Sequence, residues 1–222
     1  ISRSMIQIAI IGLGRIGASL GLALRRNKGA NYEVLGHDRE PRAAGYAEKT
    51  GAVARIEWNL PRLCEHADVL VLALPLSEMR ETLALVGLLA RPNSVTLDTT
   101  PLKAPVLAWA EELFPPDRYF IGGHPILNPA LLHDGNIGVD AARADLFEHS
   151  LFALIPARSA PPEALKLGHD LARFVGASPF FMDAAEHDGL VAATDAVPGL
   201  LAAALLLAVT ESSGWPEMRK VA

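Results

Sequence analysis

The chain of 222 residues has a single cysteine, Cys64, and this scarcity excludes two kinds of site. One cysteine cannot close an internal disulfide or form a cysteine-rich zinc site. The sequence also lacks H-E-x-x-H, and several histidines have no partner at metal-ligand spacing: His37, His66, His133, His149 and His169. No metal ion is therefore predicted. A chain without disulfides suits a reducing compartment, so we expect a cytoplasmic protein.

The chain also lacks an excess of positive charge and a long unbroken apolar run. It has 20 Lys and Arg against 25 Asp and Glu, a formal net charge of −5, so no nucleic-acid partner is predicted. The most apolar stretch, residues 197–209, contains Pro198 and Gly199. It is shorter than the ~20 residues that span a bilayer. We therefore expect a buried core helix there and no membrane function. Residues 1–4 are interpreted as a leader.

Hydrophobic residues make up 50% of the chain, which is enough for a sizeable core, and they follow an alternating pattern. Strand-like runs occupy residues 5–11, 32–36, 68–74 and 94–97, and helical patterns occupy 15–27, 41–50 and 77–89, with Ser77 as the expected N-cap of the last helix. Short strands are expected at 119–121, 152–155 and 179–182, with a helix at 161–175. This alternation is typical of parallel strands joined by right-handed crossovers.

From Asp183 onward the sequence turns wholly helical and rich in Ala and Leu. We therefore predict two domains. Residues 1–182 form a dinucleotide-binding α/β domain with a doubly wound, mostly parallel sheet. Residues 183–222 open a smaller all-helical domain for substrate binding or dimerisation. The two alternatives for this short segment are that it is truncated in this chain or that it folds only against a second subunit.

A glycine-rich turn supports the dinucleotide prediction. Residues 12–17 read G-L-G-R-I-G between an expected strand and helix, a Rossmann-type phosphate loop. Such a turn brings backbone and a helix N-terminus close to a pyrophosphate. An acidic residue about 20 positions further on, at the end of the second strand, would bind the adenosine ribose. Asp38 stands there. The alternative is a glycine turn that only packs a helix on a strand.

Asp38 also bears on the choice of dinucleotide. A carboxylate at this position repels a 2′-phosphate and favours NAD. Arg39, next in the chain, could instead stack on the adenine or pair with a phosphate. NADP therefore stays open as the second cofactor.

With these residues assembled, the chain resembles the prephenate/arogenate dehydrogenase family of tyrosine biosynthesis. The resemblance rests on five ordered segments: GLGRIGASLGLALRR at 12–26, VLALPLSEMRETL at 71–83, DTTPLK at 98–103, GGHP at 122–125 and AEHDGLVAATDAVPGLLAAAL at 185–205. It implies hydride transfer from the carbon that bears the ring hydroxyl to a nicotinamide, with decarboxylation to an aromatic ring. A histidine, here His124 in an expected Gly-Gly-His-Pro turn, would accept the hydroxyl proton.

The resemblance also implies residue roles. Catalysis would use His124 and Thr100. Cofactor contacts would come from Gly12, Leu13, Gly14, Arg15, Ile16, Gly17, Asp38, Arg39, Ala73, Leu74 and Pro75. Substrate contacts would come from Thr99, Lys103, Thr194 and Asp195. Gly122 and Gly123 would leave room for the cofactor ring. A homodimer is expected through the helical domain, around residues 200–209.

Two departures from the family pattern leave alternatives open. Pro101 replaces a serine whose hydroxyl holds the substrate oxygen, so Thr99 or Thr100 would have to supply that group. Asp195 replaces a histidine; it would repel the carboxylates of prephenate and suit the amino group of arogenate. The alternatives are a dehydrogenase of the same architecture for another small hydroxy or amino acid, and a dinucleotide-binding protein without catalysis. His187 and Asp188 are interpreted as capping and interdomain residues.

Overall fold

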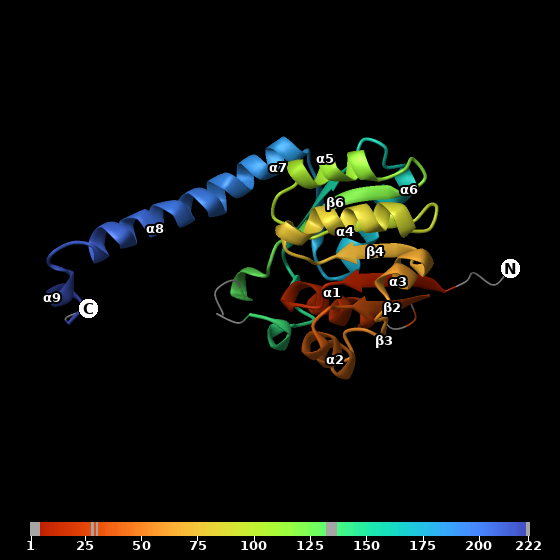
Figure 1. Cartoon of the computed structure of the whole chain (residues 1–222), viewed down its shortest axis with the longest axis horizontal. Coiled ribbons are helices and arrows are strands. Elements are labelled where there is room, and N and C mark those ends of the chain that lie inside the picture. The colour runs from red at the N-terminus through yellow and green to blue at the C-terminus, as the bar shows by residue number, and fades with distance from the viewer. Residues whose placement is uncertain (1–4, 28, 30, 132–136, 221–222) are drawn as a thin grey trace.

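The computed structural model of the chain describes residues 5–27, 29, 31–131 and 137–220, and the expectations on residues 1–4 and His133 lie outside this range. Within it, one sheet of eight strands runs in the order β3-β2-β1-β4-β5-β6-β7-β8 (Figure 1). The strands are β1 (Ile6–Ile11), β2 (Tyr32–His37), β3 (Arg55–Ile56), β4 (Val69–Leu72), β5 (Val95–Asp98), β6 (Tyr119–Pro125), β7 (Leu151–Pro156) and β8 (Ser178–Phe181).

Neighbouring strands pair in parallel except β6 and β7, which are antiparallel. Helices cover both faces of the sheet: α1 (Arg15–Arg25), α2 (Pro41–Lys49), α3 (Leu60–His66), α4 (Leu76–Leu89), α5 (Ala104–Leu113) and α6 (Pro162–Phe174). One hydrophobic core lies under α1, α2 and α6, and a second lies under α3, α4 and α5. The prediction of a doubly wound, mostly parallel sheet is confirmed.

The central strands are apolar along their whole length because helices cover them on both sides. All four residues of β4 and of β5 are buried, including the carboxyl-terminal Asp98. An alternating pattern would have left every second residue in water. The carboxyl ends of β1, β4, β5 and β6 therefore meet at one rim of a rigid sheet, where open α/β folds bind their ligands.

Two local expectations are wrong. Helix α4 begins at Leu76 with Pro75 as its N-cap residue, and Ser77 is an exposed helical residue that caps nothing. The GGHP segment is not a turn, because β6 continues through it as extended strand to Pro125. The antiparallel register with β7, from Ile121 opposite Pro156 to Pro125 opposite Phe152, supplies the partner that extends it.

The helical end of the chain leaves the body of the domain. Helix α7 (Ala184–Val191), a π-helical turn η3 (Ala192–Ala196) and helix α8 (Val197–Thr210) form one continuous rod that projects from the sheet and leads to α9 (Trp215–Met218) (Figure 1). The π turn ends one residue before the Val197-Pro198 bond, and the missing N–H of Pro198 interrupts the regular helical hydrogen bonds. Asp183, where we expected the domain boundary, caps the rod by accepting the N–H of Glu186.

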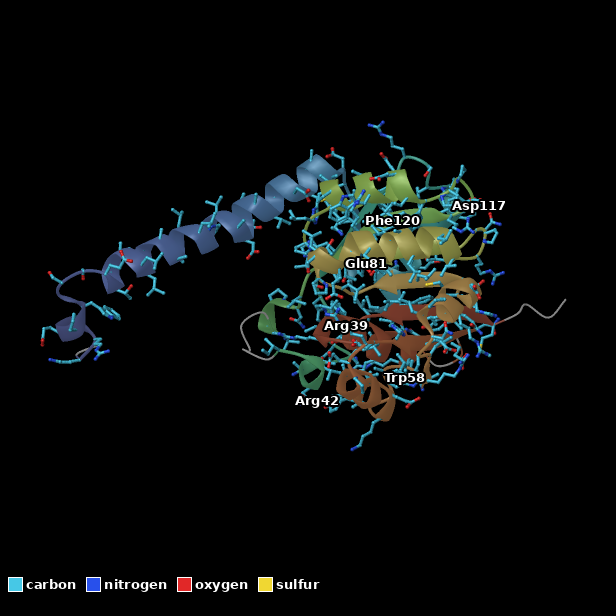
Figure 2. The ribbon with its side chains drawn as sticks, in the orientation of Figure 1. Arg39, Arg42, Trp58, Glu81, Asp117 and Phe120 are labelled. Atoms are coloured by element: carbon cyan, nitrogen blue, oxygen red, sulfur yellow. The ribbon has the colours of Figure 1, made fainter. Side chains whose placement is uncertain are left out.

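The prediction of a buried core helix at residues 197–209 is wrong for this chain. No residue of α8 is buried, and its side chains stand out from the rod (Figure 2). The continuous helix Ala184–Thr210 has 27 residues, so by length and composition it could cross a membrane. This is weak evidence for a membrane span, because core helices of soluble proteins pass the same test. The length argument made from the sequence therefore does not hold.

Candidate active site

The glycine turn after β1 is built for close backbone contact. Gly12 has φ of +92°, and a Cβ on it would lie 2.3 Å from the carbonyl oxygen of Ala73. A Cβ on Gly17 would lie 1.9 Å from the carbonyl oxygen of Gly12, so neither position accepts another residue. A Cβ on Gly14, the N-cap residue of α1, would meet nothing within 4 Å. The helix start therefore opens onto free space, as a pyrophosphate site requires.

A groove of about 360 Å³ lies beside this turn. Most of the predicted cofactor residues line it: Gly12, Gly14, Asp38, Arg39, Ala73, Leu74 and Pro75. The Asp38 carboxylate accepts the N–H of Leu13 at 2.6 Å and the N–H of Glu40 at 2.8 Å, which fixes it at the end of β2. The predicted cofactor residues that follow strands β1, β2 and β4 therefore do line one groove.

The other predicted cofactor residues support the groove from outside it. Leu13 has its side chain in the core, and Gly17 packs against Gly12. Arg15 and Ile16 open α1, where Arg15 donates to the carbonyl of Leu131 at 3.3 Å.

Arg39 spans the groove towards α4. Its guanidinium forms an ion pair with Glu78 at 2.7 Å, although the arginine side chain remains 73% exposed. Arg39 is labelled in Figure 2.

A buried ion pair lies at the carboxyl end of β5. Lys103 Nζ is 2.5 Å from the Asp98 carboxylate, and neither side chain has any exposed surface. Lys103 also donates to the carbonyl of Gly123 at 2.6 Å, and Asp98 accepts the N–H of Gly123 at 3.0 Å. Both polar groups of the Gly123 residue are therefore held by one ion pair, directly before His124.

The two glycines before His124 serve packing and leave no space for a ligand. A Cβ on Gly122 would lie 3.0 Å from the Lys103 side chain. A Cβ on Gly123 would lie 2.5 Å from the carbonyl oxygen of Asp98 and 3.0 Å from the Phe152 ring. The expectation that they leave room for a cofactor ring is wrong, because Lys103 and the neighbouring strands fill that volume.

His124 faces a second histidine from the helical rod. Its Nδ1 lies 3.0 Å from Nε2 of His187, which is itself buried. The Nδ1 of His187 lies 2.8 Å from the Asp188 carboxylate. Asp188 in turn accepts the backbone N–H groups of Lys103 and Ala104, at 2.8 and 2.9 Å, and so caps the start of α5.

Burial lowers the pKa of His124 to about 4; the Lys103 cation acts in the same direction, as would a proton on both rings of the pair of His124 and His187, and Asp188 acts against them. The imidazole is therefore neutral near pH 7 and has a lone pair available for a proton. Burial also lowers the pKa of Lys103, opposed by the Asp98 carboxylate. A neutral base beside a buried cation is an arrangement typical of catalytic sites.

The predicted substrate residues are not all placed as expected. The three N–H groups of the Lys103 ammonium donate to Asp98, Gly123 and Thr100. Lys103 therefore has no N–H left for a substrate, and its role is to fix the backbone before His124. Thr100 is buried and its hydroxyl donates to Asp98, and the Thr99 hydroxyl donates to the carbonyl of Leu72 at 3.3 Å. Neither hydroxyl has a hydrogen to spare for a substrate oxygen.

Thr194 and Asp195 lie on the exposed π turn, where the Thr194 hydroxyl donates to the carbonyl of Leu190 at 2.8 Å. At 1.5 Å per residue they stand about 10 and about 12 Å along the rod from His187.

Sequence reasoning missed Asp98, His187 and Asp188 as site residues. The signal for Asp98 was its place beside Lys103 in the segment DTTPLK. The capping interpretation of Asp188 was right in chemistry, but the helix it caps is α5. In the described residues no group of three or more His, Cys, Asp or Glu side chains could hold a metal, and the absence of a metal stays a prediction.

Comparison with known proteins agrees with this geometry. The sequence model of the prephenate dehydrogenase nucleotide-binding domain matches residues 20–181. A prephenate dehydrogenase of Lactococcus lactis subsp. cremoris is 31% identical over 205 residues, which are 91% of this chain and 53% of that protein. The crystal structure of Synechocystis arogenate dehydrogenase superposes with a TM-score of 0.81 at 26% identity, covering 98% of this chain and 75% of that one.

A second solved structure, of A. aeolicus prephenate dehydrogenase in complex with hydroxyphenyl propionate and NAD+, has a TM-score of 0.83 and covers 100% of this chain and 79% of that one. At 21% identity this likeness shows the fold alone. The chain spans about half the length of the first curated relatives it matches.

The sheet, the glycine turn and the groove define a dinucleotide-binding domain of the Rossmann class. More narrowly, the match over most of its length shows that the chain belongs to the prephenate dehydrogenase family.

The lowered pKa of His124 predicts a dependence of stability on pH. Between pH 6.5 and about 4, His124 is protonated in the unfolded chain and neutral in the native protein. Protonation therefore stabilises the unfolded state, and the free energy of unfolding falls as pH falls through this window. The contribution of His124 is roughly 2 kcal/mol between pH 7 and 4.5. Urea unfolding at the two pH values should show a smaller loss in His124→Gln than in the original protein.

The control is His169→Gln, on α6 and outside the site, which should lose as much stability as the unmodified protein. Equal pH dependence in all three proteins would contradict the lowered pKa.

Proposed function

We propose that this protein catalyses the NAD-dependent oxidative decarboxylation of prephenate or arogenate in tyrosine biosynthesis, in the cytoplasm. The observation that carries the proposal is His124, a neutral, half-buried imidazole at the carboxyl end of β6 in a chain of this family. Strands β4 and β5 separate β6 from the glycine turn after β1, which is about 14 Å at ~4.8 Å per strand. The similar proteins named prephenate dehydrogenase and arogenate dehydrogenase support the choice.

In the proposed reaction, the bound NAD supplies the hydride acceptor. The start of α1 and the Gly12 turn would hold its pyrophosphate, and Asp38 would accept hydrogen bonds from its adenosine ribose. His124 accepts the proton of the ring hydroxyl while the C–H electron pair of the same carbon leaves as hydride. The bond to the ring carboxylate then breaks, CO2 is released, and its electron pair completes the aromatic ring.

The substrate choice depends on the residues that differ from the family pattern. Pro101 has no side-chain donor, and both neighbouring threonine hydroxyls are already engaged. Asp195 is a carboxylate on the exposed π turn, about 12 Å along the rod from His187 at 1.5 Å per residue. Both substrates carry two carboxylates, and Asp195 would favour arogenate through its additional amino group. Of these residues only Asp195 bears on the choice between the two substrates, and its charge favours arogenate. These residues also support the second candidate, a dehydrogenase of the same architecture for another amine-bearing small molecule.

The activity test measures NADH formation at 340 nm in the intact protein with prephenate and with arogenate. We expect turnover, faster with arogenate. His124→Asn should bind NAD with unchanged affinity and lose about 10²–10⁴-fold in rate, because a positioned general base contributes that much. NAD binding without turnover of either substrate would reject the proposal in favour of the second candidate or of a binding protein without catalysis.

We further propose NAD as the preferred dinucleotide. Asp38 places a carboxylate where a 2′-phosphate would lie, and Glu78 holds the neighbouring Arg39 across the groove. To bind a phosphate, Arg39 would have to give up this ion pair, which lowers its contribution to NADP binding.

Glu78→Gln tests this preference, because it releases Arg39 without moving Asp38. The affinity for NADP relative to NAD should rise roughly 2- to 5-fold by titration calorimetry, as an exposed ion pair is worth at most about 1 kcal/mol. The matched control is Glu81→Gln, on the same helix, exposed and outside the groove lining (Figure 2). An unchanged ratio in Glu78→Gln would show that Arg39 does not contribute to the choice.

We propose that residues 183–222 open a helical domain that pairs two copies of the protein. Leu200, Leu201 and Leu205 are each about two-thirds exposed on α8, together with Leu206 and Leu207. Exposed apolar surface of this extent is typical of an interface, and a second copy offers the same surface in return.

Light scattering of the intact protein should give twice the mass of one chain. Leu201→Glu with Leu205→Glu should halve that mass, because two carboxylates on the α8 surface would be buried without partners. Glu186→Gln, on the exposed surface of α7, is the control that should remain a dimer. A monomer in the unmodified protein would remove the proposed pairing.

A further inference from the structure

His187 and Asp188 form a chain of hydrogen bonds that begins at Nδ1 of His124. We propose that these two residues hold His124 in the tautomer with its proton on Nδ1, which leaves Nε2 as the only nitrogen that can accept a proton. The role as a base rests on the proposed function, whereas the tautomer is a property of the chain by itself. His187 and Asp188 are therefore positioning residues.

The argument begins at Asp188, whose bonds fix its charge state. Its two oxygens accept the backbone N–H groups of Lys103 and Ala104, which cannot act as acceptors. Burial raises the pKa of this carboxyl, but the hydrogen bonds from His187 and from the two backbone groups outweigh it and lower the pKa overall. Asp188 is therefore an acceptor, and the ring nitrogen of His187 that faces it, Nδ1, must carry a hydrogen.

The position of the hydrogen on His187 determines the position of the hydrogen on His124. A neutral imidazole with hydrogen on Nδ1 has a bare Nε2. Nε2 of His187 faces Nδ1 of His124 at 3.0 Å, so Nδ1 of His124 must supply the hydrogen of that bond. The remaining nitrogen of His124, its Nε2, is then bare. The opposite tautomer of either ring would bring two lone pairs or two N–H groups face to face.

The surrounding charges agree with this assignment. The rings meet edge to face, with centroids 5.1 Å apart. The charged groups near them, besides Asp188, are Lys103 at the N-cap of α5 and its partner Asp98 on β5. The Lys103 cation disfavours a second positive charge on His124 in the resting site. When His124 accepts a proton on Nε2, its Nδ1–H keeps the bond to His187, whose other nitrogen stays anchored on the Asp188 carboxylate.

Two substitutions of His187 separate positioning from packing. Leucine fills the space but accepts nothing from Nδ1 of His124. Glutamine offers a side-chain oxygen that can accept the same hydrogen. His169→Gln, on α6, is the matched control. Histidine-selective 15N NMR of the intact protein without cofactor reads the tautomer of His124, and His124→Asn assigns its signals.

We expect the unmodified protein and His187→Gln to show His124 protonated on Nδ1, and His187→Leu to show a mixture of tautomers. With the substrate that is turned over, kcat should fall about 10²-fold in His187→Leu, the lower end of what a positioned base contributes, with KM for NAD unchanged. His187→Gln should recover most of that loss.

The inference is overturned if His124 carries its proton on Nε2 in the unmodified protein, or if His187→Leu leaves both the tautomer and kcat unchanged. A loss of kcat that glutamine does not recover would also overturn it. Absence of turnover with the tautomer as stated would instead reject the proposed function alone.

Discussion

The buried ion pair between Asp98 and Lys103 is the interaction on which the site depends. Removing one partner of such a pair costs about 3–5 kcal/mol, because the other charge is left uncompensated. This pair also binds both polar groups of Gly123. It thereby continues the contact between β5 and β6 past the last paired residues, Leu97 and Ile121. The backbone that carries His124 is fixed from the β5 side by charge and from the β7 side by an antiparallel ladder.

Local signals predicted most of the fold and the cofactor groove. Gly12, Gly17 and Asp38 are recognisable because each is required by its own short segment: a tight turn, a close helix and a strand end. The same local reasoning failed at Gly122 and Gly123. Two glycines and a proline favour a turn, but the neighbouring strand β7 and the side chain of Asp98 supply partners that only the folded sheet provides.

The histidine pair was beyond sequence reasoning for a related reason. His124 and His187 lie 63 residues apart, on a strand and on a helix, and no periodicity links them. Their contact depends on where Asp188 docks, which is the start of α5. The misjudged burial of α8 has the same origin. Apolar composition shows that a helix needs a partner but does not show that the partner belongs to the same domain.

A pKa of about 4 keeps His124 neutral but also makes it a weak base, and this restricts the order of events in the proposed reaction. A simple alcohol would not give its proton to such a base. As the C–H electron pair departs, however, the hydroxyl becomes a protonated carbonyl, which is a strong acid. The weak base therefore suffices if the proton moves with or after the hydride. Two features of the site then act together: burial keeps His124 unprotonated in the resting protein, and His187 accepts the hydrogen bond from its Nδ1. The first keeps the lone pair available, and the second determines which nitrogen carries it.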